Sequence, residues 1–198
     1  MRTLLFLLLC ASTSFAIAQI SPKAVEKNNQ SVKTAGYFDN PDSLNKAINL
    51  LDEAIAFDSS YKLAYANKVK CLMSLGQKEK ALQTLLQIEE LLPDDPCYIL
   101  GKGMMLEENA KRDLAMDAYK QAASLFEKRL KEKSSELDLM NYVLTLFLRD
   151  NKNHSLDKIE KEYPNVFSPS VRQLTQGLID KLSNMEREDA VHEMIGGR

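Results

Sequence analysis

The stretch "LGQKEKALQTLLQIEELLPDDP", residues 75–96, contains a turn, an amphipathic helix and a second turn. Gly76 favours the left-handed backbone that ends a helix, and Pro93 lies where a helix stops. Between them, apolar residues recur every three or four positions, the spacing of one face of an α-helix. Such a helix occurs in many soluble proteins, so the rest of the chain decides whether it belongs to a repeating array.

The same pattern recurs when the chain is compared with itself at an offset of 34 residues. Ala47, Ala81 and Ala115 fall on one another, and four further apolar positions align after them. The aligned sets are Ile48, Leu82 and Met116; Leu51, Leu85 and Tyr119; Ala54, Ile88 and Ala122; and Phe57, Leu91 and Leu125. A recurring alanine suits two helices that approach closely, where leucine would push them apart. We therefore predict a series of antiparallel helix pairs.

The turns before these helices carry suitable residues. Gly76 and Asn109, the latter one position earlier in register, favour the left-handed conformation. Pro41 opens the first aligned helix, with Asp42 or Ser43 as the expected N-cap.

Residues 62–95, taken as one unit, resemble the tetratricopeptide repeat family. The matching positions are Tyr65 in the first helix, Gly76 at the turn, Ala81 and Leu85 in the second helix, and Pro93 at the end. Residues 96–129 resemble a second unit, with family positions filled by Gly103, Ala115, Tyr119 and Ala122. The resemblance covers residues 43–129, and it departs from the family at Val69, in place of glycine, and at Glu127, in place of proline.

The resemblance implies an all-α fold, a right-handed α-α superhelix of antiparallel helix pairs (a TPR-like solenoid) with C-terminal capping helices. The helical domain is expected over residues 41–188, with units near 28–61, 62–95 and 96–129, a divergent unit at 135–164 and a capping helix at 168–188. Ser168 or Ser170 is the expected cap of that last helix. Residues 19–40 are expected to form a polar segment with a weak helix, and residues 189–198 a tail.

The first residues differ from the rest and predict an exported protein. Arg2 supplies a positive charge, Leu4–Leu9 an apolar core, and Ala16–Ala18 a small-residue cleavage site. Residues 1–18 are thus expected to be a signal peptide of a bacterial protein located in the periplasm or at the outer cell surface. After cleavage no stable transmembrane segment is expected, because the apolar run is short for a bilayer core of about 30 Å. An uncleaved anchor and a lipidated Cys10 are the alternatives.

Composition narrows the classes of partner. The chain has 198 residues and a formal net charge of -2, so it lacks the basic excess that binds nucleic acid. With only 7 glycines and 6 prolines it favours helices. We expect a protein or peptide partner and no nucleic acid.

No catalytic, cofactor-binding or metal-binding constellation is expected. His154 and His192 lack neighbours at metal-ligand spacing and are expected to be solvent-exposed. The glycines of "GKG", residues 101–103, lie within a helical pattern rather than after a strand, which excludes a phosphate loop. Cys71 and Cys97 would lie about 12 Å apart along parallel first helices. A disulfide needs Cα atoms under about 7 Å apart, so we expect two free, largely buried thiols.

In the tetratricopeptide repeat family the first helix of each unit lines the ligand groove. The resemblance therefore implies a partner-binding groove lined by Leu63, Ala66, Asn67, Lys70, Met73 and Ser74 in one unit and by Leu100, Met104, Glu107 and Glu108 in the next. Asn67 matches a position that grips a peptide carboxylate in some members. Cys97 and Gly101 stand where the basic partners would be needed, which argues against such a clamp. The alternative is that these residues pack against the terminal helices.

The leading hypothesis is an exported, non-enzymatic scaffold whose groove holds a peptide segment or a helix of a partner protein. A second hypothesis is a small ligand-binding protein or enzyme that uses the divergent C-terminal half, with a pocket near Tyr142, His154 and Tyr163. A third is a structural protein that self-associates through an exposed "VLTLFL" helix, residues 143–148.

Overall fold

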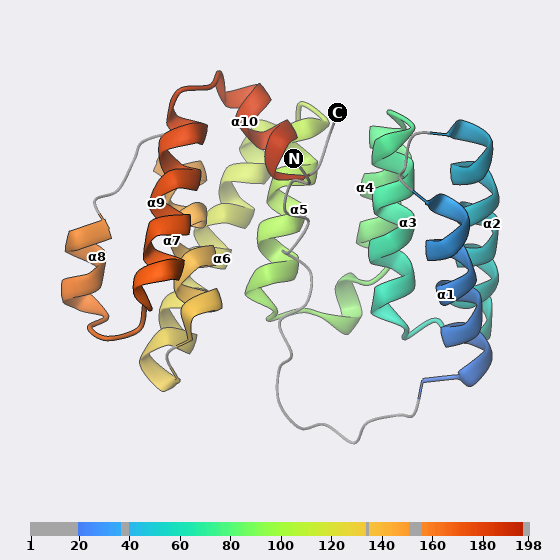
Figure 1. Ribbon diagram of the computed structural model, residues 1–198, viewed down its shortest axis with the longest axis horizontal. Coiled ribbons are helices and arrows are strands. Elements are labelled where there is room, and N and C mark those ends of the chain that lie inside the picture. Colours follow the sequence, from blue (N-terminus) through green and yellow to red (C-terminus); the bar gives the residue numbers. More distant parts are fainter. Residues whose placement is uncertain (1–19, 37–39, 134, 151–155, 196–198) are drawn as a thin grey trace. The chain divides into compact units, whose positions relative to one another are not determined.

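The computed structural model describes residues 20–36, 40–133, 135–150 and 156–195, and over these ranges it contains helices and no strand (Figure 1). In chain order the elements are α1 (Pro22–Ala35), α2 (Pro41–Phe57), α3 (Lys62–Ser74), α4 (Lys78–Leu86), the short 3-10 helix η1 (Glu89–Leu91), α5 (Pro96–Glu108), α6 (Arg112–Glu132), α7 (Glu136–Asp150), α8 (Leu156–Glu162), α9 (Pro169–Ser183) and α10 (Arg187–Met194). The prediction of an all-α fold built from consecutive packed helices is confirmed. The predicted signal peptide, residues 1–18, and His154 lie outside the described residues.

The helices form two compact units that divide between Pro93 and Asp94. Among the described residues, the N-terminal unit holds 20–93 and the C-terminal unit 94–195. The sequence predicted a single domain over 41–188. The division falls in the expected turn between two repeats, Pro93–Pro96.

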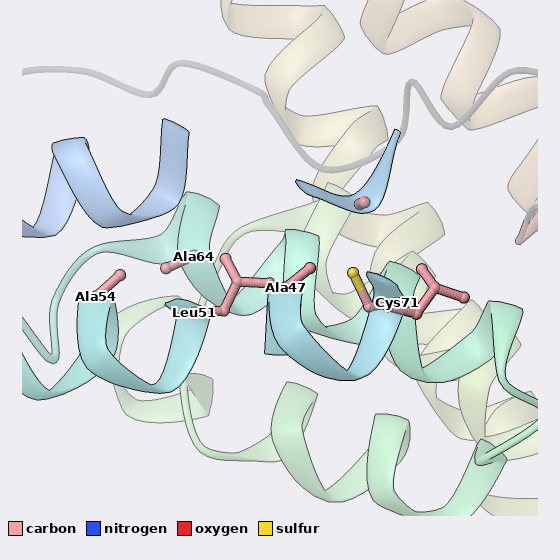
Figure 2. Packing of buried hydrophobic residues seen from close by; sticks show 7 residues of the cluster. Ala47, Leu51, Ala54, Ala64 and Cys71 are labelled. Atoms are coloured by element: carbon pink, nitrogen blue, oxygen red, sulfur yellow. The ribbon is translucent and has the colours of Figure 1, made fainter. Parts of the chain in front are cut away.

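The N-terminal unit is two helix pairs, in which α2 packs against α1 and α3, and α4 packs against α3. Its core contains Ala47, Leu51, Ala54, Ala64 and Cys71, all 1% exposed or less (Figure 2). The alanines that the 34-residue comparison aligned, Ala47, Ala81 and Ala115, are each 0% exposed. The recurring small residue therefore lies at a helix contact, as predicted.

The last aligned position behaves differently. Phe57 and Leu91 are 46% and 40% exposed, although the periodicity placed them on the buried face. The Nζ atom of Lys23 lies 5.5 Å from the centroid of the Phe57 ring, which gives this exposed aromatic residue a cation–π contact. Helix α4 ends at Leu86, so Leu91 lies beyond it. If the helix continued, Glu89 and Glu90 would lie near its C-terminus, where the helix dipole disfavours negative charge.

Helix α1 has 14 residues and packs against α2 and α3, whereas only a weak helix was expected for residues 19–40. It buries Ala24, Asn28, Ser31 and Ala35 against its neighbours. The side chains that it buries are small or polar, so the segment lacks the apolar stripe from which a helix is usually recognised. Tertiary packing, rather than a strong local preference, forms this helix.

The turns that end α3 and α5 have the same hydrogen bonds. In the first, Gly76 N donates to Met73 O and Gln77 N donates to Leu72 O, both at 2.9 Å. This pair of bonds is a Schellman motif, in which the residue after the helix is left-handed. Gly76 has φ of +69° accordingly.

In the second turn, the same two bonds are made by Ala110 N to Glu107 O and by Lys111 N to Leu106 O, again at 2.9 Å. The left-handed residue is Ala110, with φ of +57°, and the prediction that Asn109 takes this role is wrong. The Asn109 side chain instead donates to Met105 O at 2.8 Å. The hydrogen-bond pattern, repeated at the 34-residue offset, selects the left-handed position over the residue that prefers it locally.

The N-caps were predicted less accurately than the helices. Asn40, not Asp42 or Ser43, caps α2, because its Oδ1 accepts from the backbone N–H groups of both those residues. Asp95 caps α5 in the same way. Ser168 caps α9, as one of the two predicted alternatives.

In the C-terminal unit, α6 packs against α5 and α7, and α9 contacts α7 and α10. Gly103 of α5 lies so close to the Tyr119 ring of α6 that a Cβ atom built on it would meet Cε1 at 2.6 Å. Residues 187–194 form α10, which packs on α5 (Figure 1) and includes residues 189–194 of the segment predicted to be a tail. This helix buries Ala190, Val191 and Met194. Its apolar face is hard to recognise in the sequence because the segment is short and rich in acidic residues.

Cys71 is a free, buried thiol, as predicted, and no disulfide joins it to Cys97. Burial raises the pKa of the Cys71 thiol to about 11, which keeps it protonated and unreactive. Cys97 is also buried, at 1% exposed, but it is not among the free cysteines of the described residues, so the prediction of a second free thiol is not confirmed. Across the described ranges, no helix is both long and apolar enough to cross a membrane.

Candidate functional site

The predicted groove residues of the N-terminal unit lie on α3. Met73 is buried, and the other five, Leu63, Ala66, Asn67, Lys70 and Ser74, are partly exposed. Helix α1 packs beside α3, and Asn67 Nδ2 donates to Asn28 Oδ1 at 2.8 Å. Because Asn28 is only 1% exposed, this bond satisfies a buried amide and holds the two helices in register. One hydrogen of the Asn67 amide is thus used within the protein.

The predicted groove residues of the C-terminal unit lie on α5 and are far less accessible. Leu100 and Met104 are 0% and 2% exposed. The side chains of Glu107 and Glu108 are 8% and 5% exposed, although both are carboxylates at adjacent positions. Burying two carboxylates is costly in free energy unless each has a partner. The contacts of each carboxylate therefore have to account for its burial.

Glu107 is held by groups from α6 and α10. Both Nε and Nη2 of Arg187 donate to its carboxylate, the latter at 3.0 Å, in the two-pronged arrangement that suits a guanidinium. Tyr119 donates its hydroxyl to Glu107 Oε2 at 2.9 Å from the buried side. Burial and the nearby Glu107 charge raise the pKa of Tyr119, so the phenol stays protonated and remains a donor.

The guanidinium of Arg187 also reaches two other helices. Its Nη2 atom donates to the backbone oxygen of Leu148 in α7 at 2.7 Å and lies 3.9 Å from the sulfur of Met116 in α6. The Arg187 side chain is 13% exposed. One side chain of α10 therefore contacts α5, α6 and α7 together.

Glu108 has a separate partner on the same helix. Its Oε1 atom lies 2.8 Å from His192 Nδ1, and the His192 side chain is 32% exposed. The prediction that His192 is simply solvent-exposed missed this contact. The apolar side chains of Ala190, Val191 and Met194 on the same helix are also buried.

Glu107 and Glu108 therefore pack against a terminal helix, which was the predicted alternative to an open groove. We define the α10 site as Glu107 and Glu108 of α5, with Met116 and Tyr119 of α6 and the backbone oxygen of Leu148. The signal available in the sequence was the spacing of Arg187, Ala190, Val191 and Met194, which is one helical face over eight residues. The acidic residues Glu188, Asp189 and Glu193 make this apolar face hard to recognise in the sequence.

The other hypotheses receive less support from the geometry. Tyr142 and Tyr163 lie edge to face with ring centroids 6.0 Å apart, so they contact each other, and His154, the third residue of the pocket hypothesis, lies outside the described residues. Within the described ranges, no group of three histidine, cysteine or acidic residues is placed to hold a metal ion. The "VLTLFL" side chains, residues 143–148, are all buried, so this helix does not present the exposed apolar face that self-association was expected to use.

A comparison with models of protein families agrees with the repeat pattern. A comparison with curated proteins finds no match. The family model described as the tetratricopeptide repeat matches residues 42–99, which cover α2, α3, α4, η1 and the first residues of α5. Repeats of this family generally mediate protein–protein interaction. Residues 42–99 are thus similar to tetratricopeptide repeats in sequence, and they have the consecutive helix packing of such repeats.

Proposed function

We propose that this chain is an exported, non-enzymatic scaffold that binds a segment of a partner protein on its first-of-pair helices. The observation that carries the proposal is the α10 site, where the groove face of α5 holds a helix through side chains at predicted groove positions. Helix-in-groove binding is a recurrent mode of peptide recognition. The match of residues 42–99 to a repeat that generally binds proteins supports the same function.

In the N-terminal unit, we expect a segment of another protein to bind on the exposed side of α3. Ala66, Lys70 and Ser74 are spaced along one side of α3 and are partly exposed. They combine a small residue, a cation and a hydroxyl, while Met73 behind them is buried. A mixed surface of this kind suits a peptide that offers both backbone hydrogen bonds and small apolar contacts.

Site-specific photocrosslinking in the native host tests this proposal. A photoreactive amino acid at Ala66 is expected to capture a discrete partner, whose crosslinked peptide is then identified by mass spectrometry. The matched control is Gln83, an exposed position on α4. Equal capture from both positions, or none from Ala66, would count against the α3 face as the binding surface.

Export is tested separately from binding. Edman sequencing of the protein isolated from its host is expected to begin at Gln19, after cleavage that follows Ala18. Cell fractionation is expected to place the protein in the periplasm or at the outer surface. Isolation of a chain that begins at Met1 and remains in the cytoplasmic fraction would contradict export and would leave the binding proposal standing.

A further inference from the structure

We propose that α10 is a displaceable internal ligand, and that the α10 site takes an amphipathic helix of a partner that carries an arginine at the start of its apolar stripe. This inference rests on the proposed scaffold function and adds the chemistry of the partner. It concerns the C-terminal unit alone, so it is tested independently of the α3 face.

The first argument is the position of the contacts. Glu107 and Glu108 are the two most C-terminal of the predicted groove positions on α5, and both bind α10 side chains. Arg187 provides the contact that is most specific, because two of its nitrogens bind one carboxylate and one of them also binds the Leu148 oxygen. A lysine has no planar fork with which to make these contacts.

The second argument is the pattern of the helix. Arg187, Ala190, Val191 and Met194 follow the i, i+3, i+4, i+7 spacing of a single helical face. Ala190 and Val191 are each 1% exposed and Met194 is 6% exposed. The site therefore accepts a small residue and a branched residue in the middle of the helix and a long, flexible one at its end. His192 adds a polar contact beside this face.

The third argument is that α10 is weakly held by its own sequence. It has 8 residues, whereas isolated helices shorter than about 12–15 residues are marginal in water. Its N-cap, Glu186, makes no side-chain capping bond within the described part of the chain. Glu186, Glu188 and Asp189 are exposed. The helix can leave the site without unfolding the helices beneath it, as segments of low local stability do.

The fourth argument concerns what a buried ion pair is suited to do. The Arg187 and Glu107 side chains are 13% and 8% exposed, and pairs this buried recover little net stability beyond their desolvation cost. They do discriminate strongly between partners, because a helix without the arginine leaves Glu107 buried and unpaired. Buried polar contacts of this kind favour selective binding over tight permanent packing.

The test uses the full chain and a fluorescein-labelled peptide with the sequence of residues 184–195, "NMEREDAVHEMI". Val191→Glu places a charge on the buried face of α10 and changes no residue of the α10 site. The matched control is Gln173→Glu, at an exposed position of α9. Hydrogen exchange at residues 187–195 verifies that α10 is released in the first variant and retained in the second.

By fluorescence polarisation, the Val191→Glu variant is expected to bind the peptide about ten-fold or more tightly than the wild-type chain or the Gln173→Glu variant, because a tethered helix competes at an effective concentration near the millimolar range. A peptide with Arg187→Glu is expected to lose this binding. Introducing Glu107→Arg into the Val191→Glu chain is expected to restore binding of that altered peptide and to reject the original one.

Three results would overturn the proposal. Equal, weak binding by all chains would show that α10 is a fixed structural cap. Equal binding of both peptides to the Val191→Glu variant would show that the arginine does not select the helix. A wild-type dimer that becomes monomeric on Val191→Glu, measured by light scattering, would show that α10 is exchanged between two copies. Photocrosslinking at Ala66 is unaffected by any of these outcomes, so the two proposals fail separately.

Discussion

The Tyr119 hydroxyl donates to Glu107 Oε2 at 2.9 Å, the same oxygen that accepts from Arg187 Nη2 at 3.0 Å. Tyr119 is 0% exposed and belongs to the repeating set of residues aligned with Leu51 and Leu85. In the earlier repeats the residues at this position, Leu51 and Leu85, only fill the core. In the third repeat Tyr119 also donates a hydrogen bond to the charged Glu107. Tyr119 is therefore part of both the helical core and the α10 site.

Tyr119→Phe is expected to destabilise the C-terminal unit by about 1.5–3 kcal/mol, the usual contribution of a hydrogen bond to a charged group. Urea denaturation followed by circular dichroism measures the change. The matched control is Tyr65→Phe, which removes a longer, 3.2 Å bond to the neutral oxygen of Ser59 and should cost about 0.5–1.5 kcal/mol. Equal costs at both positions would contradict a charge-assisted bond at Tyr119.

Gly103→Ala is expected to destabilise the C-terminal unit, even though alanine is normally the better helix former by about 1 kcal/mol. The added Cβ would lie 2.6 Å from Tyr119 Cε1 and 3.3 Å from Ala118 Cβ, so the buried Tyr119 ring or the two helices must shift. Overpacking of this kind costs about 1–3 kcal/mol. Thermal unfolding of the purified variant measures it.

The matched control for that change is Gly177→Ala in α9. Here an added Cβ meets no heavy atom of the described chain within 4 Å, and the glycine is exposed. The change is expected to stabilise the helix by about 0.5–1 kcal/mol. A loss of stability at Gly177 similar to that at Gly103 would show that neither effect comes from the Tyr119 contact.

Ala110→Gly is expected to stabilise the protein, because Ala110 is exposed and has φ of +57°. A left-handed conformation costs a residue with a Cβ atom about 1–2 kcal/mol, and glycine avoids most of this cost. The reverse change at the equivalent turn, Gly76→Ala, is expected to destabilise by a similar amount. Opposite shifts in the urea midpoint would verify both, and shifts of the same sign would contradict the equivalence of the turns.

Much of the helical framework could be predicted because it depends on local patterns that repeat. The alanine at Ala47, Ala81 and Ala115 and the turn at Gly76 are visible from spacing alone. Ala110 and Asn40 were missed because the choice of a capping residue depends on which backbone groups are left unpaired, and this shifts by one or two positions. Helix α1 was underestimated because it buries Asn28 and Ser31 rather than a stripe of large apolar residues.

The α10 site could be predicted only in part, for a different reason. The resemblance to a known repeat placed Glu107 and Glu108 in a groove, but nothing local connects Glu107 with Arg187, 80 positions later in the chain. The contact depends on how α9 returns the chain to α5, which is a property of the tertiary fold. The same is true of the Asn28–Asn67 bond between α1 and α3, whose partners are 39 positions apart.

Asp58 is expected to make the stability of the N-terminal unit depend on acid pH. The hydroxyl of Ser60 donates to Asp58 Oδ1 at 2.6 Å, and the backbone N–H of Ser21 donates to Oδ2 at 2.9 Å. These bonds, the first above all, hold the pKa of Asp58 below its usual value of 3.8. Because the folded pKa is lowered, the carboxylate stabilises the fold above the unfolded pKa, and this contribution is lost as the pH falls through the folded value.

Asp58→Asn should therefore lower the stability measured near neutral pH and flatten the part of the stability profile below about pH 4, where the unfolded carboxyl titrates. Ser60→Ala should shift the same profile in the same direction by a smaller amount, because the bonds from the backbone of Ser21 and Ser60 remain. Urea denaturation of the three chains at a series of pH values measures these profiles. If the stability of Asp58→Asn falls as steeply below about pH 4 as that of the wild type, other carboxylates cause the loss of stability in acid.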